Sequence, residues 1–312
     1  MAKNANLHAA KTAKNDEFYT QYSDIEKEMA HYKDFFKDKV VYCNCDDARE
    51  SNFFKFFSYN FEHLGLKKLI CTGYKADGKG VVLTYEGDKN GNRKVDEEEI
   101  VVTELNGNGD FRSEECIEFL KESDVVVTNP PFSLFREYVA QLMEYGKKFI
   151  VIGNQNAITY KEIFPYIKNN QLWWGTDCVR WFIMPSDTNK QTKLNNNGEV
   201  VAEGARSRWY TNIPHAKRNT PLDLYKKYNA EEYPKYDNYD AIEVSETDEI
   251  PMDYNGVIGV PITFLDKYCP EQFEIVGGYN YSRDYDGHTW NAKVNGKYVF
   301  KRILIKRKLS CE

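Results

Sequence analysis

The chain has 312 residues, a formal net charge of −6 and 29% charged residues. These values exclude a disordered chain, and no apolar run approaches the roughly 18 residues that a membrane-spanning helix needs. The acidic balance argues against a protein that coats nucleic acid through bulk charge, although it is compatible with a local basic face. Aromatic residues reach 15%, with 23 Tyr and 18 Phe, which predicts a substantial core and leaves rings for stacking on a ligand or a base.

The N-terminus carries basic side chains but no apolar h-region, so we expect no secretory signal. Seven scattered cysteines fit reduced thiols in a cytoplasmic protein. Cys43 and Cys45 form a C-x-C with no second pair at zinc spacing, and they lie in a strand-like run. We therefore predict that both are buried as small hydrophobic residues and that the protein holds no metal.

Helix and strand patterns alternate along the first half of the chain. After a flexible segment at 1–15, apolar residues at helical spacing predict an amphipathic helix over 24–36. Strands are expected at 39–44, 67–74, 124–128 and 147–154, helices at 52–65 and 133–146, and a short loop followed by a helix within 110–123. Ser133 is the expected N-cap of the last helix, which Gly146 ends. This order predicts an α/β fold with a mostly parallel twisted sheet and helices on both faces.

The pattern changes in two places. An insertion at 81–105 has two β-rich arms around a Gly/Asn-rich turn, which predicts a hairpin. Its turn resembles a calcium loop, but Arg93 stands where such a loop needs glycine, so calcium is the less favoured interpretation. Two further strands are expected within 172–185 and 203–214.

Asn129, Pro130, Pro131 and Phe132 follow the apolar strand directly. This places an amide and rigid backbone carbonyls at the carboxyl end of a parallel strand, where open α/β sheets bind ligands. This loop suits a planar ligand with an exocyclic NH₂ group. The amide and carbonyl oxygens can accept the two hydrogens of that group, while the aromatic ring of Phe132 stacks on the face of the ligand. A lone tetrapeptide of this kind is also common as a simple proline turn.

The Asn-Pro-Pro-Phe sequence resembles motif IV of S-adenosylmethionine-dependent amino-methyltransferases. Three further segments, at 16–20, 44–53 and 109–111, resemble motifs X, I and III in the order of the γ class. Together with segments 128–139, 208–212 and 261–277, nearly the whole chain is similar to the EcoRI-type family of adenine-specific DNA methyltransferases. The resemblance implies a Rossmann-like methyltransferase domain over 1–215 and a C-terminal target-recognition region over 216–312.

The resemblance also implies roles for individual residues. Asn129 and the Pro130 carbonyl would accept from the adenine amine, Pro131 would hold the loop, and Phe132 would stack on the flipped base. The residues expected to bind the cofactor S-adenosylmethionine are Phe18, Tyr19, Thr20, Asn44, Asp46, Ser51, Asp110 and Phe111. Motif I normally has a Gly-rich turn, and this chain has none there. The alternative interpretations are that Tyr19 is a core residue, that Asp110 is a turn residue and that Asp46 caps a helix.

A basic segment with interleaved aromatic residues predicts the DNA contacts. The residues expected to touch DNA are Arg206, Arg208, Trp209, Lys217 and Arg218. The alternative is a solvated strand edge protected by its charges. The expected partner is double-stranded DNA, and the expected state is a monomer or weak dimer. The resemblance allows a companion restriction endonuclease and leaves open an orphan role. Two other functions are compatible with the sequence. One is a methyltransferase that acts on RNA or on a protein glutamine amide, and the other is a binding protein without turnover.

Overall fold

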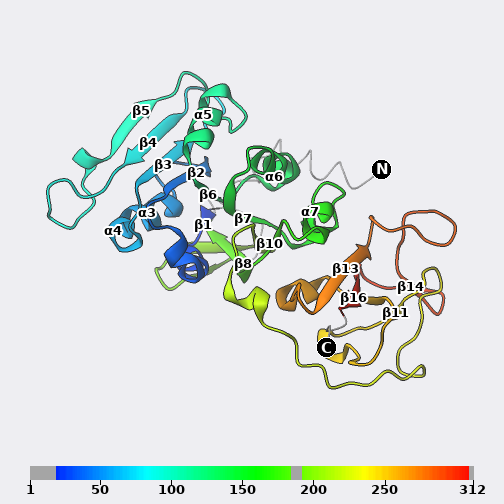
Figure 1. The fold of residues 1–312 in the computed structure, drawn as a ribbon. Coiled ribbons are helices and arrows are strands. Elements are labelled where there is room, and N and C mark those ends of the chain that lie inside the picture. Colours follow the sequence, from blue (N-terminus) through cyan, green and yellow to red (C-terminus); the bar gives the residue numbers. More distant parts are fainter. Residues whose placement is uncertain (1–18, 184–191, 309–312) are drawn as a thin grey trace. The chain divides into compact units, whose positions relative to one another are not determined.

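The computed structural model describes residues 19–183 and 192–308, and its largest element is a ten-stranded sheet (Figure 1). Four central strands pair in parallel in the order β3, β2, β6 and β7. Their bounds are Lys68–Gly73, Val40–Asp46, Val125–Thr128 and Lys148–Asn154. All four residues of β6 are buried, as expected for β-branched strands covered on both faces. The predicted α/β class with a Rossmann-like central sheet is confirmed.

Antiparallel strands extend the sheet at both sides of this centre. The predicted hairpin is confirmed as β4 (Val81–Tyr85) and β5 (Val101–Glu104), which pairs onto β3. On the other side β10 (Val200–Thr211) pairs antiparallel with β7. Beyond it lie β8 (Trp173–Ile183) and β1 (Tyr19–Thr20), while the short β9 (Thr192–Leu194) pairs with β10. Among the strand pairs described for this sheet, parallel pairing occurs between the four central strands.

Helices cover both faces of the sheet, as predicted. One face carries α2 (Tyr22–Met29), the 3₁₀ turn η1 (Ala30–Phe35), α3 (Asn52–Tyr59) and α4 (Phe61–Leu64). Their aromatic rings pack with Val41, Val125 and Ile150 in one buried cluster. The opposite face carries α5 (Glu114–Glu122) and α6 (Phe135–Glu144). There the ring of Tyr42 contacts Phe119 of α5 at a centroid distance of 6.4 Å.

The helix ends follow the sequence in part. Gly65 and Gly146 have φ of 63° and 62°, so both predicted glycine stops adopt the left-handed conformation. The predicted cap at Ser133 is wrong. A 3₁₀ turn, η3 (Phe132–Leu134), precedes α6, and the cap position is occupied by Leu134, which makes no side-chain hydrogen bond there. Pro131 has an extended backbone with ψ of 126°, and α6 begins at Phe135, one residue later than a cap at Ser133 would give.

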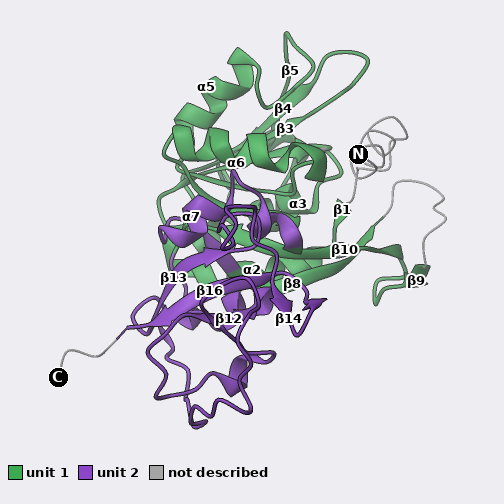
Figure 2. Cartoon of the chain, turned by 90° about the vertical axis from the view of Figure 1, so that its right-hand side faces the viewer, with its two compact units in different colours: residues 1–155, 175–213 green, residues 156–174, 214–312 purple. Residues whose placement is uncertain are grey.

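The chain divides into two compact units, shown in different colours in Figure 2. The first contains residues 1–155 and 175–213, and the second contains 156–174 and 214–312. The break after 213 lies near the boundary expected at 215, whereas no sequence pattern indicated that 156–174 belongs with the C-terminal part. That segment includes α7 (Phe164–Lys168). The functional roles of the two units stay a prediction.

The second unit has its own sheet and core. The strand order is β11 (Ile242–Glu243), β12 (Ile258–Pro261), β16 (Arg302–Arg307) and β13 (Phe273–Gly278). A separate hairpin is formed by β14 (Lys293–Val294) and β15 (Lys297–Tyr298). Beside the sheet, Trp290 is fully buried among Tyr236, Ala292 and Leu304.

A buried carboxylate joins α2 to β8 in the first unit. Glu28 has no exposed surface and accepts hydrogen bonds from Tyr32 Oη (2.8 Å), Thr176 N (3.0 Å) and Asp177 N (2.8 Å). Burial raises the pKa of this carboxyl. The preceding Gly175 leaves the space that the carboxylate fills.

Gly175→Ala is expected to lower the free energy of unfolding by about 1–3 kcal/mol, because the new methyl group overpacks this contact. Its Cβ would lie 2.1 Å from Glu28 Oε1 and 2.8 Å from Trp209 Cβ. Urea denaturation measures the loss, and Gly107→Ala is the matched control because no heavy atom lies within 4 Å of its added Cβ. Equal stabilities of the two variants would contradict the prediction.

No helix within residues 19–183 and 192–308 has both the length and the apolar character needed to cross a bilayer.

Candidate functional site

The expected site lies at the carboxyl ends of β2 and β6, where the strand order reverses. From β2 the chain continues to β3 on one side, whereas β6 pairs with β2 on the other. Thr128 Oγ1 at the end of β6 donates a hydrogen bond to the Asn44 carbonyl of β2. Open α/β sheets bind ligands at such a reversal. The structure therefore brings motifs I and IV together at this edge.

Asn44 joins three elements at the reversal. Its side-chain oxygen accepts from Tyr138 Oη of α6 and from Cys45 Sγ, and the residue is only 4% exposed. These contacts hold the end of β2 against α6 rather than presenting the amide oxygen to a ligand. In place of the predicted cofactor contact, the Asn44 side chain positions the end of β2 against α6. Sequence reasoning missed Tyr138, which lies on the apolar face of a helix with no local signal.

The Asn-Pro-Pro-Phe segment forms a short loop between β6 and α6. Pro131 opens η3 and its carbonyl accepts from Leu134 N at 2.9 Å. Phe132 is partly buried, and its ring meets that of Phe182 edge to face at 6.4 Å. Asn129 is also partly buried, and its Oδ1 atom has almost no exposed surface. The loop is thus fixed by its own turn and by a ring contact with β8.

The end of β2 compensates for the missing glycines of motif I. Cys45 has a φ of 67°, the left-handed region that favours glycine, and the β2–β3 register shifts between Cys43 and Asp46. A non-glycine residue in this conformation costs about 1–2 kcal/mol, so the surrounding contacts must hold it there. The expectation that Cys45 is buried like Cys43 is wrong, since Cys45 is partly exposed at this irregularity.

Ser51 is not available for the cofactor contact that we expected. It is fully buried, and its hydroxyl caps α3 by accepting from Phe53 N at 3.2 Å. The role of a helix N-cap explains a serine at this position. The side chain of Asp46 lies outside the described part of the chain, so the prediction for Asp46 stays untested.

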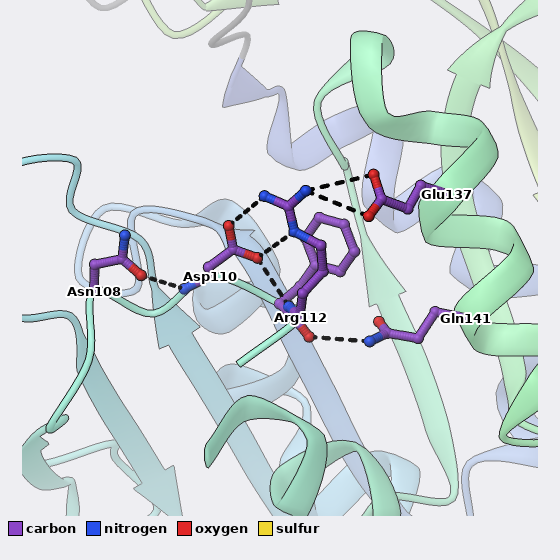
Figure 3. A network of polar contacts seen from close by, with 6 residues as sticks. Asn108, Asp110, Arg112, Glu137 and Gln141 are labelled. Atoms are coloured by element: carbon purple, nitrogen blue, oxygen red, sulfur yellow. Dashed lines mark hydrogen bonds and ion pairs between the residues drawn. The ribbon is translucent and has the colours of Figure 1, made fainter. Parts of the chain in front are cut away.

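Asp110 lies in a network of polar contacts on the loop before α5 (Figure 3). Its carboxylate accepts from Arg112 Nη2 at 2.6 Å, Arg112 Nε at 2.9 Å and Arg112 N at 2.9 Å. Arg112 Nη1 also reaches Glu137 of α6 at 3.3 Å. The hydrogen bonds from Arg112 hold the pKa of Asp110 below its usual range. A carboxylate has about four acceptor positions, so Asp110 keeps one for a further donor.

The residue after Asp110 connects this network to the strand reversal. Phe111 is buried and its ring meets Tyr138 edge to face at 5.0 Å, while Gln141 Nε2 donates to the Phe111 carbonyl at 3.3 Å. Tyr138 in turn contacts Asn44. Motifs I, III and IV are therefore linked through one helix. A buried Phe111 is a wall of the site rather than a freely exposed ring.

Three glycines, Gly73, Gly80 and Gly109, explain how the Asp110 loop crosses the end of β3 and the start of β4. Added Cβ atoms at Gly80 and Gly109 would lie 2.7 Å and 2.4 Å from the Gly73 carbonyl oxygen. Gly109 also has a φ of 80°. Only glycine allows these backbones to approach so closely. The signal in the sequence was the run Gly107-Asn108-Gly109 directly before Asp110.

The residues resembling motif X lie at the edge strand β1. Tyr19 and Thr20 pair with Ile183 and Phe182 of β8, and Asn52 at the start of α3 donates to the Thr20 carbonyl at 2.8 Å. Thr20 Oγ1 is buried and has no hydrogen-bond partner among the described residues. Since β8 also contacts Phe132, the structure brings motif X to the same group of elements. The other residue predicted here, Phe18, lies outside the described range.

Two of the five residues predicted to touch DNA are buried. Trp209 has no exposed surface and its ring packs edge to face on Phe53 at 6.2 Å, so it is a core residue. Arg218 is 8% exposed, hydrogen-bonds to Asn170 and lies 3.7 Å from the centre of the Trp173 ring. Burial also lowers the pKa of its guanidinium. Both predictions are wrong, because these side chains already have partners inside the protein.

The other three basic residues remain candidates for DNA contact. Arg206 and Lys217 are exposed and Arg208 is partly exposed. Arg206 and Arg208 belong to β10 in the first unit, whereas Lys217 belongs to the 3₁₀ turn η5 (Ala216–Asn219) in the second. Over the described ranges, no three His, Cys, Asp or Glu side chains form a group that could hold a metal ion.

Comparison with known proteins identifies the family of the chain. The family described as adenine-specific methyltransferase EcoRI matches residues 6–308. The type II methyltransferase M.EcoRI of Escherichia coli is 48% identical, over 99% of both chains. M.MgeORF184P of Mycoplasma genitalium and M.MpnI of Mycoplasma pneumoniae are each 39% identical over at least 96% of this chain and 98% of theirs. No solved structure matches the chain. The chain therefore belongs to the EcoRI family of adenine-specific methyltransferases.

Proposed function

We propose that this protein transfers a methyl group from S-adenosylmethionine to the N6 amine of an adenine flipped out of duplex DNA. The observation that carries the proposal is the loop Asn129–Phe132 at the strand reversal, directly beside the end of β2. The type II methyltransferase names of the relatives support a site-specific modification enzyme. Membership of a restriction-modification pair is the natural setting for such an enzyme.

The polar groups at the reversal fit the proposed cofactor. Thr20 Oγ1, buried without a partner among the described residues, would gain a hydrogen bond from the polar methionine part. Asp110 has one acceptor position left for the adenine amine, and Phe111 forms an apolar wall beside it. Tyr19, partly exposed on β1, completes this set. S-adenosylmethionine, when bound, supplies an electrophilic methyl group on its sulfonium.

The target adenine would meet the loop after β6. Its amine is a poor nucleophile because the nitrogen lone pair is delocalised into the ring. Acceptance of its two hydrogens by the Asn129 oxygen and the Pro130 carbonyl favours the pyramidal, attacking form, a stabilisation worth about 3 kcal/mol per acceptor by analogy with oxyanion holes. Because Asn129 Oδ1 has little exposed surface, the amide must turn about χ2 to present it, and this torsion is soft.

Duplex DNA must deliver the base to this loop. A stacked adenine cannot reach the Asn129 amide, so the base is flipped out at a cost of a few kcal/mol. Phe132, which is partly exposed, would stack on the flipped ring, while Pro131 holds the loop through its bond to Leu134. The nitrogen would attack the methyl carbon as the carbon–sulfur bond of the sulfonium breaks, so S-adenosylhomocysteine would leave and N6 would lose its proton to water. Arg206, Arg208 and Lys217 are the charges proposed to contact phosphates.

Radiolabelled methyl transfer tests this function. With labelled cofactor, we expect label in adenine of unmethylated duplex DNA, and sequencing of methylated bases will give the recognition site. Label found only in RNA or in protein glutamine would overturn the proposal, as would cofactor binding without transfer to any nucleic acid.

Asp110→Ala is expected to raise the Kd for S-adenosylmethionine by about 10–100-fold, the effect of losing one hydrogen bond to a charged group. Since Arg112 lowers the pKa of Asp110, affinity in the wild type should persist as pH falls through the ordinary aspartate range. Isothermal titration measures both effects. Asp77→Ala, which removes an exposed acid after β3, is the control, and an equal loss in this variant would argue against a specific role for Asp110.

A further inference from the structure

The β14–β15 hairpin of the second unit presents two large aromatic rings to solvent. Tyr298 is 69% exposed and Phe300, just after β15, is 63% exposed. A singly exposed ring is normal, whereas exposed rings that lie together form an apolar patch of the kind that binds a partner. Lys293 lies opposite Tyr298 in the hairpin, with its ammonium 5.9 Å from the centre of the ring. We call Lys293, Lys297, Tyr298 and Phe300 the hairpin surface.

The exposure does not result from a loosely held loop. Asn295 and Gly296 have φ of 49° and 76°, the pattern of a tight type I′ turn. Their N–H groups donate to the Asp237 carboxylate at 3.1 Å and 2.8 Å. Three residues before Lys293, Trp290 is fully buried. The hairpin is therefore anchored at its base and at its turn.

Side-chain alternation separates a core face from an outer face. Val294 and Val299 pack against the buried cluster around Trp290. Val299 N also donates to the Ala292 carbonyl at 2.9 Å, so the paired geometry continues past β15. Because successive side chains of a strand point to opposite sides, Tyr298 and Phe300 share the outer face with Lys293. Lys297 pairs with Val294, so it lies on the other side of the hairpin, where it is exposed beside the turn.

A buried ion pair sets the position of Phe300. Arg302 Nη1 donates to the Phe300 carbonyl at 2.9 Å, and the same guanidinium is paired with the buried Glu243. The ring is thus carried on a backbone that is tied into the core of the unit. Rigid aromatic residues lose little conformational entropy on binding, which suits them to contact a partner.

We propose that the hairpin surface binds the duplex DNA substrate, an inference that rests on the proposed function. Lys293 on the outer face and Lys297 beside the turn would contact phosphates, and the rings of Tyr298 and Phe300 would pack on sugars and on the thymine methyl groups at the groove. Duplex DNA matches the surface because it combines anionic phosphates with apolar sugars and thymine methyl groups. The carboxylate of Asp237 contacts the hairpin at its turn. It accepts hydrogen bonds from the turn N–H groups and does not form an ion pair with either lysine.

Fluorescence anisotropy with a short duplex tests the proposal, using the sequence that the wild-type enzyme is found to methylate. Phe300→Ala should raise the Kd about tenfold with an unchanged salt dependence, because it removes an apolar contact and no charge. Lys293→Ala/Lys297→Ala should reduce the magnitude of the log Kd against log salt slope by about 2, one for each phosphate contact. All changed side chains lie at the surface, and thermal denaturation verifies that each variant is folded.

Matched controls lie in the first unit. Tyr59→Ala removes a ring with a similar exposure of 66%, and Lys33→Ala/Lys37→Ala removes two exposed charges. If wild type methylates DNA and the hairpin variants bind it no more weakly than these controls, the hairpin surface is not a DNA contact. Loss of affinity in the hairpin variants alone supports it. Absence of methylation by wild type on any DNA would instead overturn the proposed function.

Discussion

Asn129→Ala is expected to lower kcat for adenine methylation by about 10²–10³-fold, the effect of removing one preorganised group at a developing charge. The amide lies at the end of β6, where Thr128 is bonded to the Asn44 carbonyl and Pro131 to Leu134, so the rest of the loop should keep its shape. The substitution removes an acceptor for the adenine amine and leaves Thr20 and Asp110 in place. The Kd for S-adenosylmethionine should therefore stay within about twofold of wild type, far below the tenfold change that 1.4 kcal/mol would produce.

Single-turnover transfer of labelled methyl groups, with parallel calorimetry of cofactor binding, separates the two expectations. Asn219→Ala, an exposed asparagine at the end of η5, is the control for a general effect of the substitution. A transfer rate near that of wild type would refute the role of Asn129. A large loss of cofactor affinity would show instead that the loop supports the cofactor site.

Glu243→Ala is expected to lower the free energy of unfolding by about 3–5 kcal/mol, since it leaves a buried guanidinium without its counter-charge. Arg302 Nε lies 3.0 Å from both Glu243 oxygens, and the two residues are 9% and 6% exposed. Tyr236 Oη and Ser245 Oγ also donate to this carboxylate, so three groups lose a partner at once. A change of this size is a large fraction of the stability of a typical domain.

Urea denaturation followed by Trp fluorescence measures this loss, and Trp290 reports on the unit that contains the ion pair. The exposed Glu246→Ala is the control, with an expected change within about 0.5 kcal/mol. Because the chain has two compact units, the second unit is expected to unfold in a separate, earlier transition in the Glu243 variant. A single transition at the wild-type midpoint would contradict the prediction.

Local pattern predicted most of the first unit. The run Val125–Val127, followed by two prolines, predicts a buried strand that stops at a defined edge, and β6 is that strand. Apolar spacing from Ile25 to Phe36 likewise predicts the helical segment that covers one face. These elements are determined by neighbouring residues, because side-chain period and backbone restriction act within a few positions of the chain.

Errors arose where a residue type suits two environments. Trp209 and Arg218 lie in a basic, aromatic segment that resembles a DNA-binding surface, yet one faces Phe53 and the other Asn170 and Trp173. Burial depends on partners tens of residues away, which no local pattern specifies. Ser51 was misassigned for a related reason, since the same hydroxyl can cap a helix or bind a ligand.

By itself the sequence determined the fold class, the family and the loop that carries Asn129, because these depend on motif order and short-range periodicity. Only the tertiary structure decided where the many aromatic and charged residues of the chain lie. Much of the aromatic surplus fills the core, and a smaller part lies exposed on the hairpin at Tyr298 and Phe300. It also decided which charges are available, since pairing removes Arg218 and Arg302 from the surface while leaving Lys293 and Lys297 near it. The physical reason is that burial and pairing are long-range properties of the folded chain.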